Sequence, residues 1–309
     1  MQTIFGISKI KKKYPNPVIA LGVFDGLHLG HRQLIGSVVA HAKAIDGTVM
    51  VMTFDPHPVH VLRPEKKMPL IVSLPYRLKL LEQLGVDVCI VVRFTKRFAK
   101  MTPEKFIKND LVGMIHPGEV VVGDDFRFGC NRSGTLDYFQ KAAQIYGFNI
   151  LAIQANVREG HKVVSSARIR ECIAQGKLYQ AAKLLDRPVS VFGKVVRGDG
   201  RGKGLGFPTV NINPTIEIVP PLGVYFSYVC FDGRKYPAVA NVGRRPSVRK
   251  SEDVNVEAHI LNFRKNVYGR EIVIEFIKKI RPERKFASEE ALARQIQLDV
   301  KKARAWFKK

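Results

Sequence analysis

The chain has 309 residues, of which 46% are hydrophobic and 25% are charged. Both fractions are typical of a folded protein, and the length favours two domains over one. The 51 Lys and Arg residues outnumber the 27 Asp and Glu residues, which gives a formal charge of +24. Such a charge suits anionic partners: polyphosphate substrates, nucleic acid or acidic lipid. No apolar run reaches the length of a membrane span or a signal peptide, so we expect a cytoplasmic protein without a membrane partner.

Strands and helices alternate through the first half of the chain. The pattern predicts strands at 18–24, 48–54, 86–92, 119–123 and 149–153, and helices at 29–45, 75–84, 103–114, 136–146 and 167–185. Alternation of this kind predicts an α/β domain of Rossmann-like organisation, with a parallel sheet and helices on both faces. Ligands bind such sheets at the carboxyl ends of the strands, so functional residues are expected in the turns that follow them.

The pattern changes after about residue 186. Strand-like runs follow at 189–196, 224–231, 236–242, 254–261 and 272–280, and turns rich in Gly and Pro separate them. They predict an antiparallel β-domain in the form of a small barrel. A helix from Ser288 to about Phe307 closes the chain, with Ser288 as its N-cap. We therefore predict domains at 1–186 and 187–309.

The first strand runs into a glycine-rich turn with two histidines, Gly22-Val23-Phe24-Asp25-Gly26-Leu27-His28-Leu29-Gly30-His31. Glycines let the backbone bend tightly, and the helix that follows offers free N–H groups and its positive dipole end to a phosphate. His28 and His31 could both donate hydrogen bonds to a polyphosphate. The alternatives are a structural turn or a pair of metal ligands. The candidates are His28 and His31 for catalysis and, for phosphate binding, Gly22, Phe24, Asp25 and Gly30.

This turn resembles the H-x-G-H motif of nucleotidylyltransferases. In the form G-V-F-D-G-x-H-x-G-H it is similar to the adenylyltransferase half of prokaryotic bifunctional FAD synthetases. Further segments that begin at Phe54, Gly123 and Val164 fit that family in the same order. The resemblance implies a nucleotidylyltransferase domain that transfers the adenylyl group of ATP to FMN. The chain has neither G-x-x-x-x-G-K-[ST] nor G-x-G-x-x-G, so it predicts neither a P-loop nor a dinucleotide fold of the usual kind.

A second anion site is predicted where the last helix of this half begins. Ser165 and Ser166 precede the helix and Arg170 follows closely, so hydroxyls, a helix N-terminus and a guanidinium come together. The alternative is an ordinary Ser N-cap with a surface Arg. The family resemblance favours ATP binding by these residues. Ala167 departs from the family pattern, which has Thr there, so one hydroxyl for the phosphates is lost.

Flavin contacts are predicted in two other turns. Asp125, Phe126 and Phe128 follow the strand at 119–123, where two aromatic rings could flank a flat ligand or belong to the core. His57 lies between two prolines after the strand at 48–54, where it could contact FMN or ATP or cap the loop.

The β-domain contains its own phosphate-binding candidate. A loop with alternate glycines, including Gly202, Gly204 and Gly206 and carrying Lys203, leads into Phe207-Pro208-Thr209-Val210-Asn211. Thr209 and Asn211 are two apart on an extended chain, so both face the same way and offer oxygens to a hard cation such as Mg²⁺. On a later strand Glu257 points away from the apolar face, as either a base for an alcohol or a solvent-facing residue.

The Gly-Leu-Gly-Phe-Pro-Thr-Val-Asn run resembles the riboflavin kinase signature, as do segments that begin at Pro221, Asn241 and Val256. The resemblance implies a six-stranded barrel in which Thr209 and Asn211 serve Mg²⁺ and ATP and Glu257 is the catalytic base. Pro208 and the loop glycines would bind ATP. Lys203 stands where the family more often has Arg, so the charge is kept and the bidentate geometry is not. The resemblance extends from about Val18 to Asp299.

Together these features predict a bifunctional enzyme that phosphorylates riboflavin to FMN and adenylylates FMN to FAD with release of pyrophosphate. The alternatives are an RNA-binding protein, a nucleotidylyltransferase with another phosphorylated substrate, and a chain with one inactive site. The +24 charge favours RNA, but no RNA-binding motif with interleaved aromatics accompanies it. The expected partners are therefore ATP, riboflavin and FMN, and nucleic acid is not expected.

Overall fold

A computed structural model describes residues 1–154, 157–159, 162–214, 217–244 and 254–308, with the backbone alone at Arg158, Lys162 and Lys203. The chain folds into two compact units. The first comprises Met1–Met68 and Leu74–Ser165, and the second comprises Pro69–Ser73 and Ser166–Lys309. The domain boundary at 186/187 stays a prediction.

The first unit is built on a six-stranded sheet whose paired strands are all parallel, in the order β1-β4-β3-β2-β5-β6. Its strands read as continuous apolar runs because helices cover both faces of such a sheet. Every strand predicted in this half is present, and β1 adds an edge strand that was not predicted. The strands are β1 Gln2–Phe5, β2 Val18–Leu21, β3 Val49–Asp55, β4 Val88–Arg93, β5 Glu119–Gly123 and β6 Asn149–Ile153.

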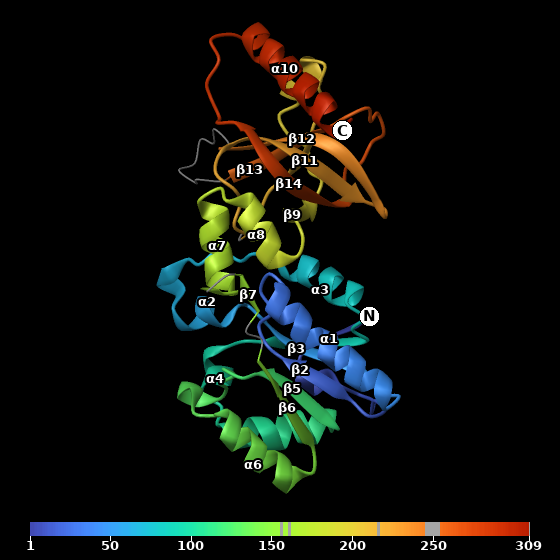
Figure 1. The fold of residues 1–309 in the computed structure, drawn as a ribbon, viewed down its shortest axis with the longest axis vertical. Helices are drawn as coiled ribbons and strands as arrows, with labels where there is room; N and C mark the ends of the chain where they lie inside the picture. The colour runs from blue at the N-terminus through green and yellow to red at the C-terminus, as the bar shows by residue number, and fades with distance from the viewer. Residues whose placement is uncertain (155–156, 160–161, 215–216, 245–253, 309) are drawn as a thin grey trace. The chain divides into compact units, whose positions relative to one another are not determined.

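Helices lie on both faces of this sheet, as predicted. Helix α1 (Leu29–Ala44) contacts β2, β3 and β5, while α6 (Leu136–Tyr146) contacts β6 (Figure 1). A core cluster that includes Ile19, Phe106 and Phe139 joins the sheet to α6 and to the π-helix η3 (Phe106–Ile115). The remaining helical segments are α2 Pro58–Leu62, α3 Leu74–Gln83, α4 Lys96–Ala99, α5 Pro103–Lys105, η1 Ile7–Lys9, η2 Pro64–Lys66 and η4 Cys130–Arg132. A two-stranded pair, β7 Arg158–Glu159 and β8 Lys162–Val163, follows β6.

The prediction of one helix at 167–185 was wrong, since the structure has two. Helix α7 (Ser166–Ala174) ends before Gly176, and α8 (Leu178–Leu185) begins just after it. Gly176 has a φ of +71°, a left-handed conformation that ends an α-helix. The turn lets α8 pack on β9 and β14 of the second unit.

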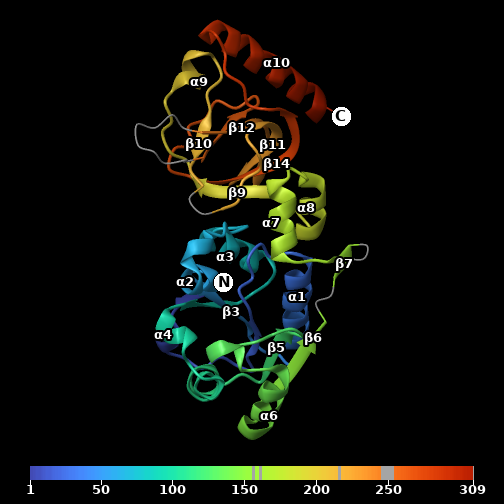
Figure 2. The same cartoon turned by 90° about the vertical axis from the view of Figure 1, so that its left-hand side faces the viewer.

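The second unit contains an antiparallel sheet of six strands in the order β10-β13-β12-β11-β14-β9 (Figure 2). Its edges meet where the Val196 N–H donates to the Asn211 carbonyl at 2.9 Å, which closes the sheet into the predicted barrel. The loop before β10 contains a helical turn, α9 (Arg201–Gly204), that was not predicted. The strands are β9 Val189–Lys194, β10 Val210–Ile212, β11 Gly223–Phe231, β12 Arg234–Arg244, β13 Val254–Ile260 and β14 Glu271–Arg281.

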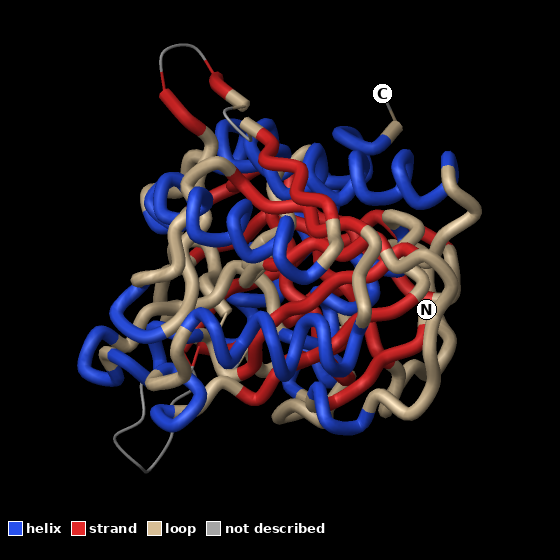
Figure 3. Tube along the Cα trace, turned by 90° about the horizontal axis from the view of Figure 1, so that it is seen from below, coloured by secondary structure: helices blue, strands red, loops and turns tan. Residues whose placement is uncertain are grey.

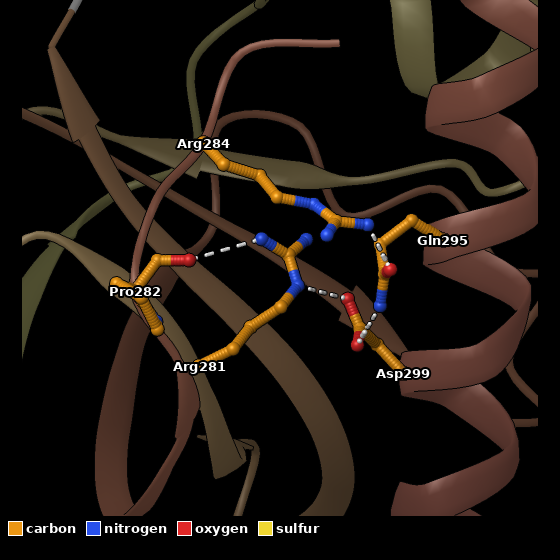
Figure 4. A network of polar contacts seen from close by, with 5 residues as sticks. All are labelled: Arg281, Pro282, Arg284, Gln295 and Asp299. Carbon is orange, nitrogen blue, oxygen red and sulfur yellow. Dashed lines mark hydrogen bonds and ion pairs between the residues drawn. The ribbon is translucent and has the colours of Figure 1, made fainter.

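Helix α10 (Glu289–Phe307) ends the described chain (Figure 3). Ser288 is its N-cap, as predicted, and accepts the Ala291 N–H at 3.3 Å. Val300 and Ala303 pack onto the outer face of the barrel. The buried Asp299 carboxylate accepts from Arg281 Nε and from Gln295 Nε2, both at 2.9 Å, which ties the helix to the end of β14 (Figure 4). None of the described helices combines the length and the apolar character that a membrane span needs.

Candidate functional site

The turn after β2 adopts backbone conformations that few residues tolerate. Phe24 (φ +53°), Gly26 (φ +83°) and Leu27 (φ +43°) all lie in the left-handed region. A Cβ atom at Gly22 would lie 2.8 Å from Cζ of Phe24, so the folded turn requires glycine there. Left-handed backbone costs a Phe or a Leu about 1–2 kcal/mol, and such strain clusters at ligand-binding turns.

His28 ends the turn as the N-cap of α1. Its Nδ1 atom accepts the backbone N–H of His31 at 3.4 Å. A neutral imidazole that accepts through Nδ1 carries its proton on Nε2, so His28 has an Nε2–H group to donate. Together with the first N–H groups of α1, this donor suits a phosphate oxygen.

His31 lies directly against His28, with the ring centroids 3.6 Å apart and the rings nearly parallel. Burial holds the pKa of His31 well below its ordinary value, and the neighbouring His28 and Arg77 lower it further. His31 is therefore neutral at pH 7. Its Nδ1 atom is buried and has no hydrogen-bond partner in the part of the chain that the structure describes.

The structure thus gathers the predicted residues of this turn at one end of the sheet. Asp25 and His28 are buried, and Phe24 is only 1% exposed. Phosphate binding by Gly22, Phe24, Asp25 and Gly30 stays a prediction. Gly30 is buried in the first turn of α1.

The other candidate residues of the first half do not all lie in one compact unit. Ser165 belongs to the first unit, while Ser166 and Arg170 belong to the second, and the Arg170 Nε donates to the Pro69 carbonyl at 2.7 Å. A shared anion site for these residues stays a prediction. His57 is the N-cap of α2, since its Nδ1 accepts the Val59 N–H at 3.1 Å.

Phe126 and Phe128 pack into an aromatic cluster rather than standing free. Their ring centroids are 5.6 Å apart, and both rings contact Phe139 of the core. Both remain partly exposed, so one edge of the cluster faces outward. Asp125 is exposed in the turn after β5. Flavin binding by these three residues stays a prediction.

Glu257 lies in the middle of three adjacent strands of the barrel. It is paired with Asn211 of β10 on one side and with Asn241 of β12 on the other. Directly paired residues share a face of a sheet. Val256 and Ala258 are fully buried on the inner face, so Glu257 and the two asparagines project from the outer face.

A chain of hydrogen bonds joins these side chains. Asn255 Nδ2 donates to Glu257 Oε1 at 2.8 Å and to Asn211 Oδ1 at 3.2 Å. Asn211 Nδ2 donates in turn to Thr209 Oγ1 at 3.4 Å. Asn255 Oδ1 is buried without a partner among the described residues. The carboxylate is therefore held in place next to an amide and a hydroxyl.

The glycine-rich loop lies close against this cluster. A Cβ atom at Gly198 would lie 2.6 Å from Asn211 Nδ2, and one at Gly202 would lie 2.6 Å from the Phe207 carbonyl oxygen. At these two glycines the loop backbone therefore packs closely against the protein, whereas a Cβ atom at Gly204 or Gly206 would meet nothing within 4 Å. Gly204, Gly206 and Pro208 lie in the same loop, whereas the Lys203 side chain is outside the described residues.

Thr209 and Asn211 carry neutral oxygens of the kind that a hard cation takes. In this structure Asn211 turns Nδ2 toward Thr209 Oγ1 and Oδ1 toward Asn255, so binding a cation through both oxygens requires the Asn211 amide to turn. Asn255 Oδ1 nearby has no partner in the described part of the chain. Among the described residues, no group of three or more His, Cys, Asp and Glu side chains could hold a metal ion. A metal here would therefore depend on neutral oxygens and on substrate phosphates.

Sequence reasoning missed two residues that the structure places at these sites. Asn255 bridges Asn211 and Glu257, and its position two residues before Glu257 on a strand was the available signal. Arg77 is fully buried behind the histidine turn. Its signal was a charged residue on the apolar stripe of α3, three and four residues before the buried Leu80 and Leu81.

Two family models match the two halves of the chain, FAD synthetase over residues 10–168 and riboflavin kinase over residues 185–307. The chain belongs to the bifunctional riboflavin kinase/FMN adenylyltransferase family. Its domains are those of a flavin-biosynthetic transferase with a kinase activity and a nucleotidyltransferase activity, both of which use ATP.

Relatives named bifunctional riboflavin kinase/FMN adenylyltransferase match nearly the whole chain. The Escherichia coli (strain K12) protein is 38% identical over 94% of this chain and 92% of its own length. The Bacillus subtilis (strain 168) protein is 36% identical over 96% and 95%. The Buchnera aphidicola protein is 32% identical over 99% of both chains.

A crystal structure from Streptococcus pneumoniae, described as a macrolide-efflux protein, is similar at a TM-score of 0.84 and 28% identity. It covers 99% of this chain and 100% of that one. The description applies to that protein, whereas the family models and the relatives above agree on flavin biosynthesis.

Proposed function

We propose that the second unit of this chain phosphorylates riboflavin to FMN at Glu257 and that the first unit adenylylates FMN at the His28–His31 turn. The observation that carries the proposal is the hydrogen-bonded carboxylate of Glu257, held by Asn255 beside Asn211 and Thr209. A positioned carboxylate suits a reaction that must deprotonate an alcohol.

Phosphorylation of riboflavin requires a base because the attacking group is a neutral hydroxyl. Glu257 would accept the hydroxyl proton while the oxygen bonds to the γ-phosphorus of ATP and ADP leaves. Asn255 fixes the rotamer of Glu257, since it donates to Oε1 at 2.8 Å. The proposed phosphate contacts are Gly202, Lys203, Gly204, Gly206 and Pro208. At Gly204 and Gly206 a Cβ atom would meet nothing within 4 Å, which leaves the backbone accessible there.

Thr209 and Asn211 would hold the divalent cation, for which Mg²⁺ is the proposed identity. When bound, Mg²⁺ neutralises charge on the phosphate oxygens during transfer. The two side chains would hold the ion on the same face of the sheet as Glu257, because Asn211 and Glu257 are directly paired across β10 and β13.

Adenylyl transfer makes a different demand. The FMN phosphate, whose second pKa is about 6, is already ionised at neutral pH, so it can attack the α-phosphorus of ATP without a general base. Pyrophosphate leaves as the new bond forms. His28 would donate from Nε2, and the N-terminus of α1 would stabilise charge on the phosphates. Ser165, Ser166 and Arg170 are the proposed further phosphate contacts, and His57, Asp125, Phe126 and Phe128 the proposed flavin contacts.

The test separates the two reactions in one protein. Purified protein is incubated with riboflavin, ATP and Mg²⁺, and the flavins are resolved by chromatography over time. We expect FMN to appear first and FAD to follow. Glu257→Gln should lower FMN formation by about 10²–10⁴-fold, the usual contribution of a general base, while conversion of supplied FMN to FAD continues.

The reciprocal variant is His28→Ala, which should spare FMN formation and slow FAD formation. Loss of both activities in either variant would show that the roles are wrongly divided. Recovery of unchanged riboflavin from the unmodified protein would contradict the proposed function as a whole. FMN alone would leave the first unit without its proposed activity.

A further inference from the structure

Arg77 is a fully buried arginine on α3, and it ties together the ends of two strands. One of its terminal nitrogens, Nη1, donates to the Val23 carbonyl at 3.0 Å, to Thr53 Oγ1 at 3.0 Å and to the Phe54 carbonyl at 3.2 Å. Val23 belongs to the histidine turn after β2, and the other two acceptors lie near the end of β3. The guanidinium therefore fixes the turn against the neighbouring strand.

The rest of this guanidinium is unused by the protein. Nε and Nη2 are buried and have no hydrogen-bond partner among the described residues. Removing a charged group from water is costly unless its donors are satisfied, and buried unpartnered groups are rare in folded proteins. A purely structural clamp at this place needs no charge, because a neutral donor could bind the same three oxygens.

The surroundings of Arg77 connect it to the reacting end of the unit. Burial lowers the pKa of Arg77, and the charges of Asp25 from the turn and Asp55 from the end of β3 oppose this. The Cys89 thiol is neutral, since burial raises its pKa to about 12. On the other side, Arg77 and His28 both act on His31, whose Nδ1 is buried and has no partner among the residues described.

We propose that Arg77 is a positioning residue for adenylyl transfer, which holds the histidine turn against β3 and supplies a fixed positive charge beneath it. This proposal rests on the proposed formation of FAD by the first unit. Two consequences follow from the contacts. The clamp keeps His28 and the α1 N-terminus aligned with the phosphates, and the charge opposes protonation of the adjacent His31.

Three variants separate the clamp from the charge. Arg77→Lys keeps the charge but offers one nitrogen on a flexible stem. Arg77→Met keeps the approximate volume and removes the charge. Thr53→Val keeps Arg77 and removes one of its acceptors. FAD formation from supplied FMN and ATP is measured between pH 5 and 9, and circular dichroism and thermal unfolding of each variant serve as the folding control, because FMN formation is assigned to the other unit.

We expect Arg77→Met to lower kcat/KM for FAD formation by about 10²-fold, because small misplacements of a site cost that much. We also expect the acidic limb of its pH profile to move to higher pH by about one unit, since a nearby charge no longer opposes protonation of His31. Arg77→Lys and Thr53→Val should also lower kcat/KM for FAD formation. In these two variants the acidic limb of the pH profile should stay where it lies in the unmodified protein. NMR titration of the His31 ring in the same variants should show the same pattern without reference to activity.

Other outcomes would overturn the proposal. An unmoved acidic limb and an unchanged His31 titration in Arg77→Met would reduce Arg77 to a structural residue. Full FAD-forming activity in both Arg77→Lys and Thr53→Val would show that the hydrogen bonds of Arg77 do not position the histidine turn. If circular dichroism and thermal unfolding show that Arg77→Met has misfolded, Arg77→Lys and Thr53→Val decide the matter. Absence of FAD from the unmodified protein would instead contradict the proposed function, so the two failures are distinguishable.

Discussion

Asn255 shows how much of the proposed kinase site depends on one amide. It has two acceptors for its Nδ2 group, Asn211 and Glu257, and its own oxygen is buried with no partner among the described residues. The side chain is 6% exposed, so water cannot replace it easily. Without it, the Glu257 carboxylate would lose the 2.8 Å hydrogen bond to Oε1.

We predict that Asn255→Ala lowers kcat for FMN formation by about tenfold or more, since a reacting group loses its alignment. The buried acceptors left unpaired should also cost about 1–3 kcal/mol of stability. The matched control is Ser227→Ala, because Ser227 is also buried in the barrel and its hydroxyl donates to the Ala238 carbonyl, away from Glu257. An equal fall in kcat in both variants, measured by steady-state kinetics, would contradict a specific role for Asn255.

His31 gives the stability of the protein a dependence on pH. Its pKa is depressed in the folded chain and returns to about 6.5 on unfolding, so between these values the unfolded chain binds a proton that the folded chain does not. Stability should therefore fall as pH decreases below about 6.5, by up to about 1.4 kcal/mol per pH unit for this group. Urea unfolding of the unmodified protein and of His31→Gln, followed by circular dichroism at several pH values, tests this. The two curves should converge toward acid, and parallel curves would contradict the assignment.

At the scale of elements, the break between α7 and α8 illustrates how one glycine sets a topology. Both helices are amphipathic, and their apolar faces do not reveal that they are separate. Gly176 in the left-handed conformation redirects the chain, and α8 then buries Ala181, Leu184 and Leu185.

Substitution by alanine should change the stability of the protein in opposite directions at two glycines. Gly176→Ala should destabilise the protein by about 1 kcal/mol, because alanine resists the left-handed backbone. Gly36→Ala, in the interior of α1, should stabilise it by roughly 0.5–1 kcal/mol, since a Cβ there meets nothing within 4 Å. Thermal unfolding of the two variants under one set of conditions decides this. A loss of stability in Gly36→Ala would show that α1 tolerates no side chain at that position.

At the scale of the whole molecule, the structure shows which segments belong to the same compact unit as the barrel. Helices α7 and α8 belong to the same compact unit as the barrel, and α8 contacts β9 and β14. Leu70 also belongs to that unit, since its carbonyl accepts the Ile218 N–H at 2.7 Å. The barrel unit thus extends well before the predicted boundary at 186/187, which we retain as a proposal for where the family domains divide.

Two fragments test this difference. A fragment of residues 166–309 should unfold at a higher temperature than one of residues 187–309, because the shorter one loses the buried Leu184 and Leu185. Their burial is worth on the order of 5 kcal/mol, a large share of the stability of a small domain. The only tryptophan, Trp306, reports on both fragments by fluorescence. Equal melting temperatures would show that α7 and α8 are dispensable to the barrel.

The sequence by itself determined the class and the chemistry of this protein. Periodicity in apolar residues fixes strands and helices locally, which is why the alternating first half, the β-rich second half and the closing helix were all predicted correctly. The histidine turn and the Thr209–Asn211 pair could be singled out as candidates because each lies within a few consecutive residues, and their roles stay predictions. Such local signals need no knowledge of distant contacts.

Tertiary structure decided everything that depends on residues far apart in the chain. Arg77 meets Val23 and Thr53 only because parallel strands bring their ends together, and Asn255 reaches Asn211 only through the register of β10 and β13. The protonation state of His31 likewise follows from burial and from a charge on another helix. These properties arise from desolvation and from contacts across the fold, and neither can be inferred from a short stretch of sequence.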